Sequence, residues 1–133
     1  MDERPLEEQI EHDLIVNAAA QQFASSEKYV VRINPGQEHN CRVNGCYPDI
    51  VVTDRASGRV KYLIEVETVS SVDPSEAKQW QSFARIGAGL FILVPYRMVP
   101  IAEQTALTAG VKCSFGYYAE DEKGKVRIVL KKK

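Results

Sequence analysis

The hydrophobic pattern of the chain changes its period several times, and each change marks a new element. Apolar side chains first recur at helical spacing after Pro5, at Leu6, Ile10, Leu14, Ala18 and Phe23. This spacing predicts a helix over residues 5–26 that carries these side chains on an apolar face. Residues 28–33 are β-branched and aromatic, which predicts a strand, and Asn34-Pro35-Gly36 ends it.

A polar loop over residues 34–47 separates this strand from a predicted hairpin. Its strands cover residues 48–53 and 60–69, joined by the turn Asp54-Arg55-Ala56-Ser57-Gly58. Side chains alternate in the third strand, which places one set on each face of the sheet. The two sets are Val60, Tyr62, Ile64 and Val66 on one face, and Lys61, Leu63, Glu65 and Glu67 on the other.

The second half of the chain alternates helices with strands. A helix is predicted from Pro74 to about residue 86, with an inward stripe of Ala77, Trp80 and Ala84. Trp80 is expected to fill core space. The fully apolar run 90–94 predicts a strand buried on both faces, at the sheet centre. A further helix over 100–109 and strands over 112–119 and 125–130 complete the chain.

This order of elements predicts one α/β domain over residues 1–133, a mixed sheet flanked by helices on both faces. The first three strands form a meander. The connection from the third strand to the fourth runs through a helix, so these two strands are expected to be parallel, with a right-handed crossover.

Composition narrows the function classes only a little. The formal net charge is -1, so nucleic-acid contacts would have to come from local basic patches rather than from overall charge. The longest apolar run, 90–95, is too short to span a bilayer, so no membrane is expected. The charged N-terminus lacks a signal-peptide pattern, and the three cysteines lack disulfide-rich spacing, which predicts a cytoplasmic protein.

Three carboxylates are the strongest candidate site. Glu65 and Glu67 share one face of an otherwise apolar strand, where like charges need a compensating cation. The hairpin brings Asp49 next to them, close enough for Asp49 and Glu65 to share one ion. Oxygen ligands without sulfur predict Mg²⁺ or Mn²⁺. The alternative is an exposed strand face on which the two glutamates pair with Lys61 and Arg59.

These residues resemble a known family. Cys46-Tyr47-Pro48-Asp49-Ile50-Val51-Val52, a hairpin, and Leu63-Ile64-Glu65-Val66-Glu67 resemble the core motif of the PD-(D/E)xK nucleases, and the element order over residues 5–95 agrees. The resemblance implies a restriction-endonuclease-like αβββαβ core, here followed by a helix and two strands. It implies that Asp49 and Glu65 are metal ligands. Glu67 stands where the family usually has lysine, although some restriction enzymes of the family carry glutamate there.

The resemblance also implies partners for these carboxylates. In the Holliday-junction-resolvase branch a first-helix glutamate completes the metal site, and Glu11 is the candidate here, with Glu8 as its rival. Lys78 is the candidate to replace the missing lysine from the second helix, as in some relatives. Gln81, one turn further on, is a candidate contact to phosphate or to a metal-bound water.

The polar loop allows two interpretations. His39, Cys41 and Cys46, with Cys113 as a fourth ligand, suggest a Zn²⁺ site, although their spacing matches no strong zinc-finger pattern. Otherwise the loop overhangs the carboxylates, and His39 and Arg42 are candidate phosphate contacts.

The preferred hypothesis is a Mg²⁺- or Mn²⁺-dependent phosphodiester hydrolase of the endonuclease type, acting on nucleic acid and on DNA in particular. In this hypothesis Asp49, Glu65, Glu67 and Lys78 are catalytic, and Glu11 joins the metal ligands. The alternatives are a non-catalytic nuclease-fold domain that binds nucleic acid or a protein partner, and a zinc-stabilised module. A homodimer is also compatible with the resemblance, because small nucleases of this fold often cut two strands as dimers.

Overall fold

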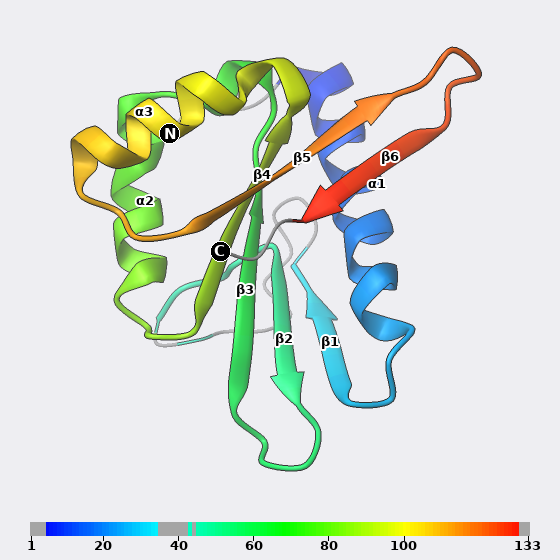
Figure 1. Cartoon of the computed structure of the whole chain (residues 1–133), viewed down its shortest axis with the longest axis vertical. Helices are drawn as coiled ribbons and strands as arrows, with labels where there is room; N and C mark the ends of the chain where they lie inside the picture. Colours follow the sequence, from blue (N-terminus) through cyan, green and yellow to red (C-terminus); the bar gives the residue numbers. More distant parts are fainter. Residues whose placement is uncertain (1–4, 35–42, 44, 131–133) are drawn as a thin grey trace.

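The chain folds into a six-stranded sheet whose strands lie side by side in chain order (Figure 1). The structure is a computed structural model, and it describes residues 5–34, 43 and 45–130. The helices are α1 (Leu6–Ala24), α2 (Pro74–Ala84) and α3 (Val99–Ala109), with short 3₁₀ turns η1 (Val69–Ser71) and η2 (Tyr96–Met98). The strands are β1 (Tyr29–Ile33), β2 (Ile50–Asp54), β3 (Val60–Val66), β4 (Gly89–Pro95), β5 (Ser114–Glu120) and β6 (Val126–Leu130).

The sheet is mixed, as the element order predicts. β1, β2 and β3 form an antiparallel meander, and β3 and β4 run parallel because α2 carries the chain back between them. β4 and β5 are also parallel, with α3 between them, and β6 returns antiparallel to β5. The αβββαβ core with an added helix and two closing strands is therefore confirmed.

Helices cover both faces of the sheet (Figure 1). On one face α1 contributes Ile15 and Val16 to a core that includes Ile64 of β3. On the other face α2 contributes Trp80 to a second core that includes Leu63. Since Leu63 and Ile64 are neighbours in one strand, the alternation predicted for β3 decides which core each of them joins.

Only part of the predicted apolar face of α1 packs against the sheet: Phe23 lies against the core, whereas the positions nearer the N-terminus do not. Leu6, Ile10 and Leu14 are 76%, 62% and 57% exposed. The buried face instead consists of His12, Ile15, Val16, Ala19 and Ala20. Leu14 lies about 200° around the helix from His12, so α1 carries two apolar stripes, and packing against the sheet selects the one with smaller side chains.

Several boundaries also differ from the sequence prediction. β2 begins at Ile50 rather than at Pro48, because proline has no N–H to donate to the sheet. β3 ends at Val66 rather than at residue 69, since the chain turns into η1, where Thr68 is the N-cap. α2 begins after Asp73, whose carboxylate accepts the Glu76 N–H, and it ends at residue 84.

The longest apolar run of the sequence lies in β4, between β3 and β5, with Leu90 to Val94 buried. It belongs to the sheet interior, as predicted. Among the residues that the structure describes, no helix combines the length and the apolar composition needed to cross a bilayer.

Candidate metal centre

β2 and β3 separate at one end of their pairing, and the side chain of Asp49 fills the opening. The pairing of the two strands ends at Ile50 and Ile64. Beyond it, the Val66 N–H donates to Asp49 Oδ2 at 2.8 Å, and the Asp49 N–H donates to Glu65 Oε1 at 3.1 Å. Carboxylate oxygens thus stand where backbone carbonyls would continue the ladder. The structure therefore brings Asp49 and Glu65 together.

His12 lies directly behind Asp49 and holds it from α1. Its ring is 1% exposed, with Nε2 3.1 Å from Asp49 Oδ2 and Nδ1 3.0 Å from Asp13 Oδ1. His12 thus ties α1 to the side chain of Asp49, 37 positions further along the chain. The sequence alone does not point to His12, because a histidine beside two acidic residues in a helix shows no spacing that identifies its partner.

Glu65 and Glu67 are buried side by side. They are 5% and 0% exposed. Burial, followed by repulsion from Asp49 and Glu67, raises the pKa of Glu65 well above its ordinary value. Among the residues that the structure describes, no lysine or arginine forms an ion pair with Glu65. The interpretation of an exposed face on which Lys61 and Arg59 pair with Glu65 is therefore wrong.

Glu67 is held by two donors from beyond β3. Ser71 Oγ donates to Glu67 Oε1 at 2.6 Å, and Trp80 Nε1 donates to Glu67 Oε2 at 2.8 Å. Burial and the nearby carboxylate of Glu76 nevertheless raise the pKa of Glu67 to about 8, because they outweigh these two bonds. The carboxyl group is thus fixed in place while its charged form is penalised.

Glu76 is a further acidic residue at this site that sequence reasoning missed. Glu65, Glu67 and Glu76 each offer a carboxylate oxygen, and these oxygens lie within 4.8 Å of one another. Asp49 borders this group through Glu65. Glu76 stands three residues after the N-cap Asp73, a spacing typical of helix capping, which concealed it in the sequence. Trp80 follows one turn later, which is why α2 presents both side chains to Glu67.

Glu11, the predicted first-helix ligand, reaches the edge of the cluster through Tyr118. The Tyr118 hydroxyl lies 2.9 Å from Glu11 Oε2 and 2.9 Å from the Glu67 carbonyl oxygen. Glu8, the rival, instead accepts the Ser70 N–H and hydroxyl at 3.1 and 2.7 Å. Tyr118 was not predicted, since nothing in the sequence links it to residues so far away.

The two α2 candidates lie apart from the carboxylates. Lys78 is exposed, and it lies about 200° around the helix from Glu76. The side chain of Gln81 donates to the Ala109 carbonyl oxygen at 2.8 Å, which ties α2 to the end of α3. The structure therefore does not gather Lys78 or Gln81 at the carboxylate cluster, because the helix turns other side chains toward Glu67.

The predictions for the polar loop fall mostly outside the described residues. His39, Cys41 and Arg42 belong to that part of the chain. Cys46 and Cys113 are half-buried and pack against the core beneath α2 and α3. The zinc site and the phosphate contacts of the loop therefore stay predictions.

The donor set fits a hard divalent cation. Glu65, Glu67 and Glu76 supply only oxygen, which suits Mg²⁺ or Mn²⁺. Ligand oxygens on opposite sides of one Mg²⁺ lie about 4.2 Å apart, so a spread of up to 4.8 Å needs only a small adjustment. The raised pKa values of Glu65 and Glu67 also fit a cation site, because a bound cation would favour the ionised carboxylates and lower these pKa values.

The raised pKa values predict that the metal-free protein loses stability as pH increases. Between the unfolded value of 4.5 and the native value of about 8, folded Glu67 keeps a proton that the unfolded chain releases. Stability present below pH 4.5 is therefore lost toward pH 8, by at most about 1.4 kcal/mol per pH unit for each such group. Urea denaturation in EDTA from pH 5 to pH 8.5 measures this slope.

The matched variants are Glu67→Gln and Glu103→Gln. Glutamine at position 67 keeps an oxygen for the Trp80 N–H and cannot ionise, so the slope should become shallower. Glu103 is exposed on α3, and its change should leave the slope as it is. A wild-type protein with equal stability at pH 5 and pH 8 would contradict the expectation.

No protein-family model matches the chain, and no curated protein matches it in sequence. Among solved structures, SfsA of Pyrococcus furiosus, determined in complex with Ca²⁺, aligns with 87% of this chain at 18% sequence identity and a TM-score of 0.41. The chain spans 58% of the length of that protein. At this TM-score and identity the likeness carries no argument about function.

Proposed function

We propose that the chain is a metal-dependent phosphodiester hydrolase that acts on nucleic acid, with DNA as the expected substrate and Mg²⁺ or Mn²⁺ as the cofactor. One observation supports this most: buried carboxylates meet where β2 and β3 separate, and no lysine or arginine of the described chain pairs with Glu65. Asp49, Glu65 and Glu67 occupy the motif positions of the PD-(D/E)xK family, and the element order agrees with it.

In this proposal each carboxylate is held in its orientation by a different set of hydrogen-bond partners. Asp49 is oriented by His12 and by the Val66 N–H, and Glu65 by the Asp49 N–H. Glu67 is aimed by Ser71 and Trp80. A bound Mg²⁺ would polarise the phosphate and lower the pKa of a bound water.

Glu67 is proposed to take one of two roles, as a ligand shared with Glu76 or as the group that orients the attacking water. Glu11 would act from the rim, through Tyr118. These supporting contacts matter because groups that are already oriented lose little free energy when the charged transition state forms.

A non-catalytic domain that binds nucleic acid or a protein partner is the second candidate, and one observation favours it. The family lysine is replaced by Glu67, and Lys78 is turned away from Glu76. Within the described chain, neither offers a cation to a scissile phosphate. The proposed hydrolase therefore depends on the charge of the metal, or on a cation other than these two positions.

The deciding experiment uses supercoiled plasmid, single-stranded DNA, branched DNA and RNA, each with Mg²⁺, Mn²⁺ or EDTA. The hydrolase proposal expects cleavage with a metal and none with EDTA. The double variant Asp49→Asn, Glu65→Gln, purified identically, reveals any contaminating nuclease. If the wild type cuts nothing under any metal condition but retains nucleic acid in a binding assay, the second candidate replaces the first.

Lys78→Ala tests the migrated-lysine prediction. Because Lys78 is exposed and points away from Glu76, we expect Mn²⁺-dependent cleavage to stay within about threefold of wild type, well short of the 100- to 1000-fold loss that removal of a preorganised charge contact causes. Glu76→Gln serves as the comparison and should raise the Mn²⁺ concentration that gives half-maximal cleavage. A 100-fold loss in Lys78→Ala would show that Lys78 reaches the substrate.

A further inference from the structure

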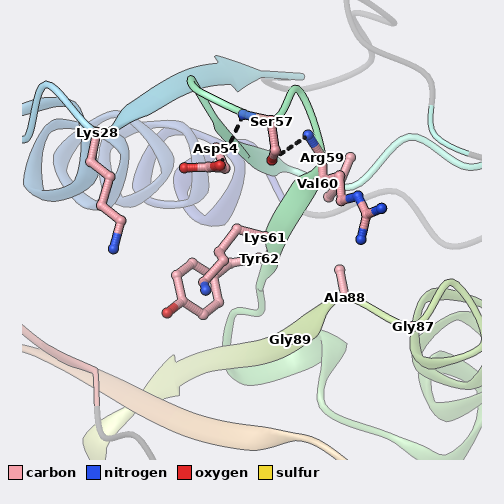
Figure 2. A pocket seen from close by; sticks show the side chains of 10 residues that line it. All are labelled: Lys28, Asp54, Ser57, Arg59, Val60, Lys61, Tyr62, Gly87, Ala88 and Gly89. Carbon is pink, nitrogen blue, oxygen red and sulfur yellow. Dashed lines mark hydrogen bonds between the residues drawn. The ribbon is translucent and has the colours of Figure 1, made fainter.

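A hollow lies at the end of β3 that is remote from Glu65 and Glu67. It has a volume of about 540 Å³ and opens between the β2–β3 turn and the segment Gly87–Gly89 that leads into β4 (Figure 2). Lys61 in its lining precedes Glu65 by four residues, which corresponds to about 13 Å along a strand. The hollow is therefore separate from the carboxylate cluster.

The lining of the hollow is positively charged. It contains Lys28, Arg59 and Lys61, with Asp54 as its acidic residue. None of these three cations forms an ion pair with any residue of the described chain. The whole chain has a formal net charge of -1, so a local excess of two positive charges is a property of this place and not of the composition.

The three cationic side chains line the hollow at separate places, with Lys61 between Lys28 and Arg59. Figure 2 shows Lys28 and Arg59 reaching toward the hollow from its two sides. Lys61 Nζ lies 6.0 Å from the centre of the Tyr62 ring, which supports its position over that ring. Asp54 Oδ2 accepts the Ser57 N–H at 3.0 Å and closes the turn. The hydrogen bonds from Ser57, and then the charges of Lys28 and Lys61, lower the pKa of Asp54, so its carboxylate faces the same hollow as these cations.

The opposite wall consists of small residues. Gly87 has a φ of 91°, a conformation that favours glycine, and a side chain there would project into open space. A Cβ atom at Gly89 would lie only 2.9 Å from Tyr62 Cδ1, so this position needs glycine for the ring to pack. Ala88 stands between them. No side chain larger than a methyl group projects from this wall, so a ligand can approach the backbone closely.

We propose that this hollow binds a phosphate group, carried either by a free nucleotide or by a nucleic-acid strand. Arg59 supplies a planar, bidentate donor that matches phosphate oxygens, and Lys28 and Lys61 add ammonium donors. The volume falls within the range of small-ligand sites, which is enough for a mononucleotide. This inference goes beyond the proposed hydrolase and does not depend on it.

The test is a titration of the metal-free full chain in EDTA, followed by the NMR shifts of backbone amides. The probes are inorganic pyrophosphate, adenosine monophosphate, and a single-stranded oligonucleotide with and without a 5′-phosphate. We expect shift changes at Lys28, at residues 57–62 and at residues 87–89. Saturation by pyrophosphate and the mononucleotide identifies a free-nucleotide site, whereas saturation by the oligonucleotides alone identifies a strand site, and either result supports the proposal.

Charge variants make the test specific. The double variant Arg59→Gln, Lys61→Gln should weaken binding of the probe that saturates by about tenfold or more, since two charge-assisted donors are lost. Lys123→Gln with Lys125→Gln removes the same charge from the β5–β6 turn and should change affinity less than threefold. Asp54→Asn removes the negative charge that repels a phosphate, so this variant should bind the phosphate probe more tightly.

Two results would overturn the proposal. One is the absence of shift changes at residues 57–62 and 87–89 with every probe at millimolar concentration. The other is an equal loss of affinity in the two double variants, which would show that the anions respond to net charge only.

Discussion

Glu65→Gln is expected to abolish metal-dependent cleavage and the stabilisation of the protein by Mn²⁺ together. Glu65 lies between Asp49 and Glu67, so its loss removes the central oxygen donor of the cluster. Loss of one preorganised electrostatic contact typically lowers the rate about 100- to 1000-fold. In the wild type, Mn²⁺ at 100 times its Kd adds about 2.7 kcal/mol to the free energy of unfolding, and this gain should vanish in the variant.

The metal-free stability of the same variant separates a metal site from a structural one. Burial and repulsion penalise the Glu65 carboxylate, whereas a glutamine oxygen can still accept the Asp49 N–H. Glu65→Gln, and likewise Asp49→Asn, should therefore leave the unfolding free energy in EDTA unchanged or higher. Urea denaturation with and without Mn²⁺ measures both quantities, with Glu103→Gln as the control. Strong destabilisation of both variants in EDTA would assign these carboxylates a structural role instead.

Trp80→Ala should cause the largest loss of stability among these variants. The side chain is fully buried and packs against the core beneath α2 and α3, with its ring 6.4 Å from that of Phe115. Truncation of a buried tryptophan typically costs about 3–5 kcal/mol, a large share of the stability of a domain of this size. The free energy of unfolding in urea is the measurement.

Trp80→Phe isolates the hydrogen bond from the packing. Phenylalanine keeps much of the volume but has no N–H to donate to Glu67 Oε2. The expected cost is about 1–3 kcal/mol, together with weaker Mn²⁺ binding because Glu67 loses one of the donors that aim it. A Phe variant that binds Mn²⁺ as tightly as the wild type would show that the indole serves the core alone.

The sequence predicted the sheet well because its strands carry strong local signals. Ile50 to Val52 and Leu90 to Val94 are continuous apolar runs, and the structure buries them at the centre of the sheet. The hairpin of β2 and β3 set the relation of Asp49 to Glu65, since two antiparallel strands joined by a short turn can pair in few registers.

The remaining parts of the site depend on contacts that no local pattern encodes. α1 carries two apolar stripes, and only docking against the sheet selects the face with His12. In the sequence, the position of Glu76 three residues after Asp73 indicates only helix capping, although in the structure Glu76 lies beside Glu67. Lys78 was a candidate to replace the family lysine because it lies a short distance along the chain from Glu67. The helix instead places Lys78 about 200° around its axis from Glu76, so the lysine does not face the carboxylates.

The contacts around Tyr118 also bear on how the chain must fold. Its hydroxyl joins Glu11 across 107 residues and the Glu67 backbone across 51, while His12 reaches Asp49 across 37. Contacts of such high sequence separation close long loops, which costs conformational entropy on folding. Release of α1 would break the contacts of Glu11 and His12, and release of β5 would break both contacts of Tyr118. A fragment ending after β4 would therefore keep the carboxylates and the contact of His12 with Asp49, but it would lose the tyrosine that joins the Glu67 backbone to Glu11 of the first helix.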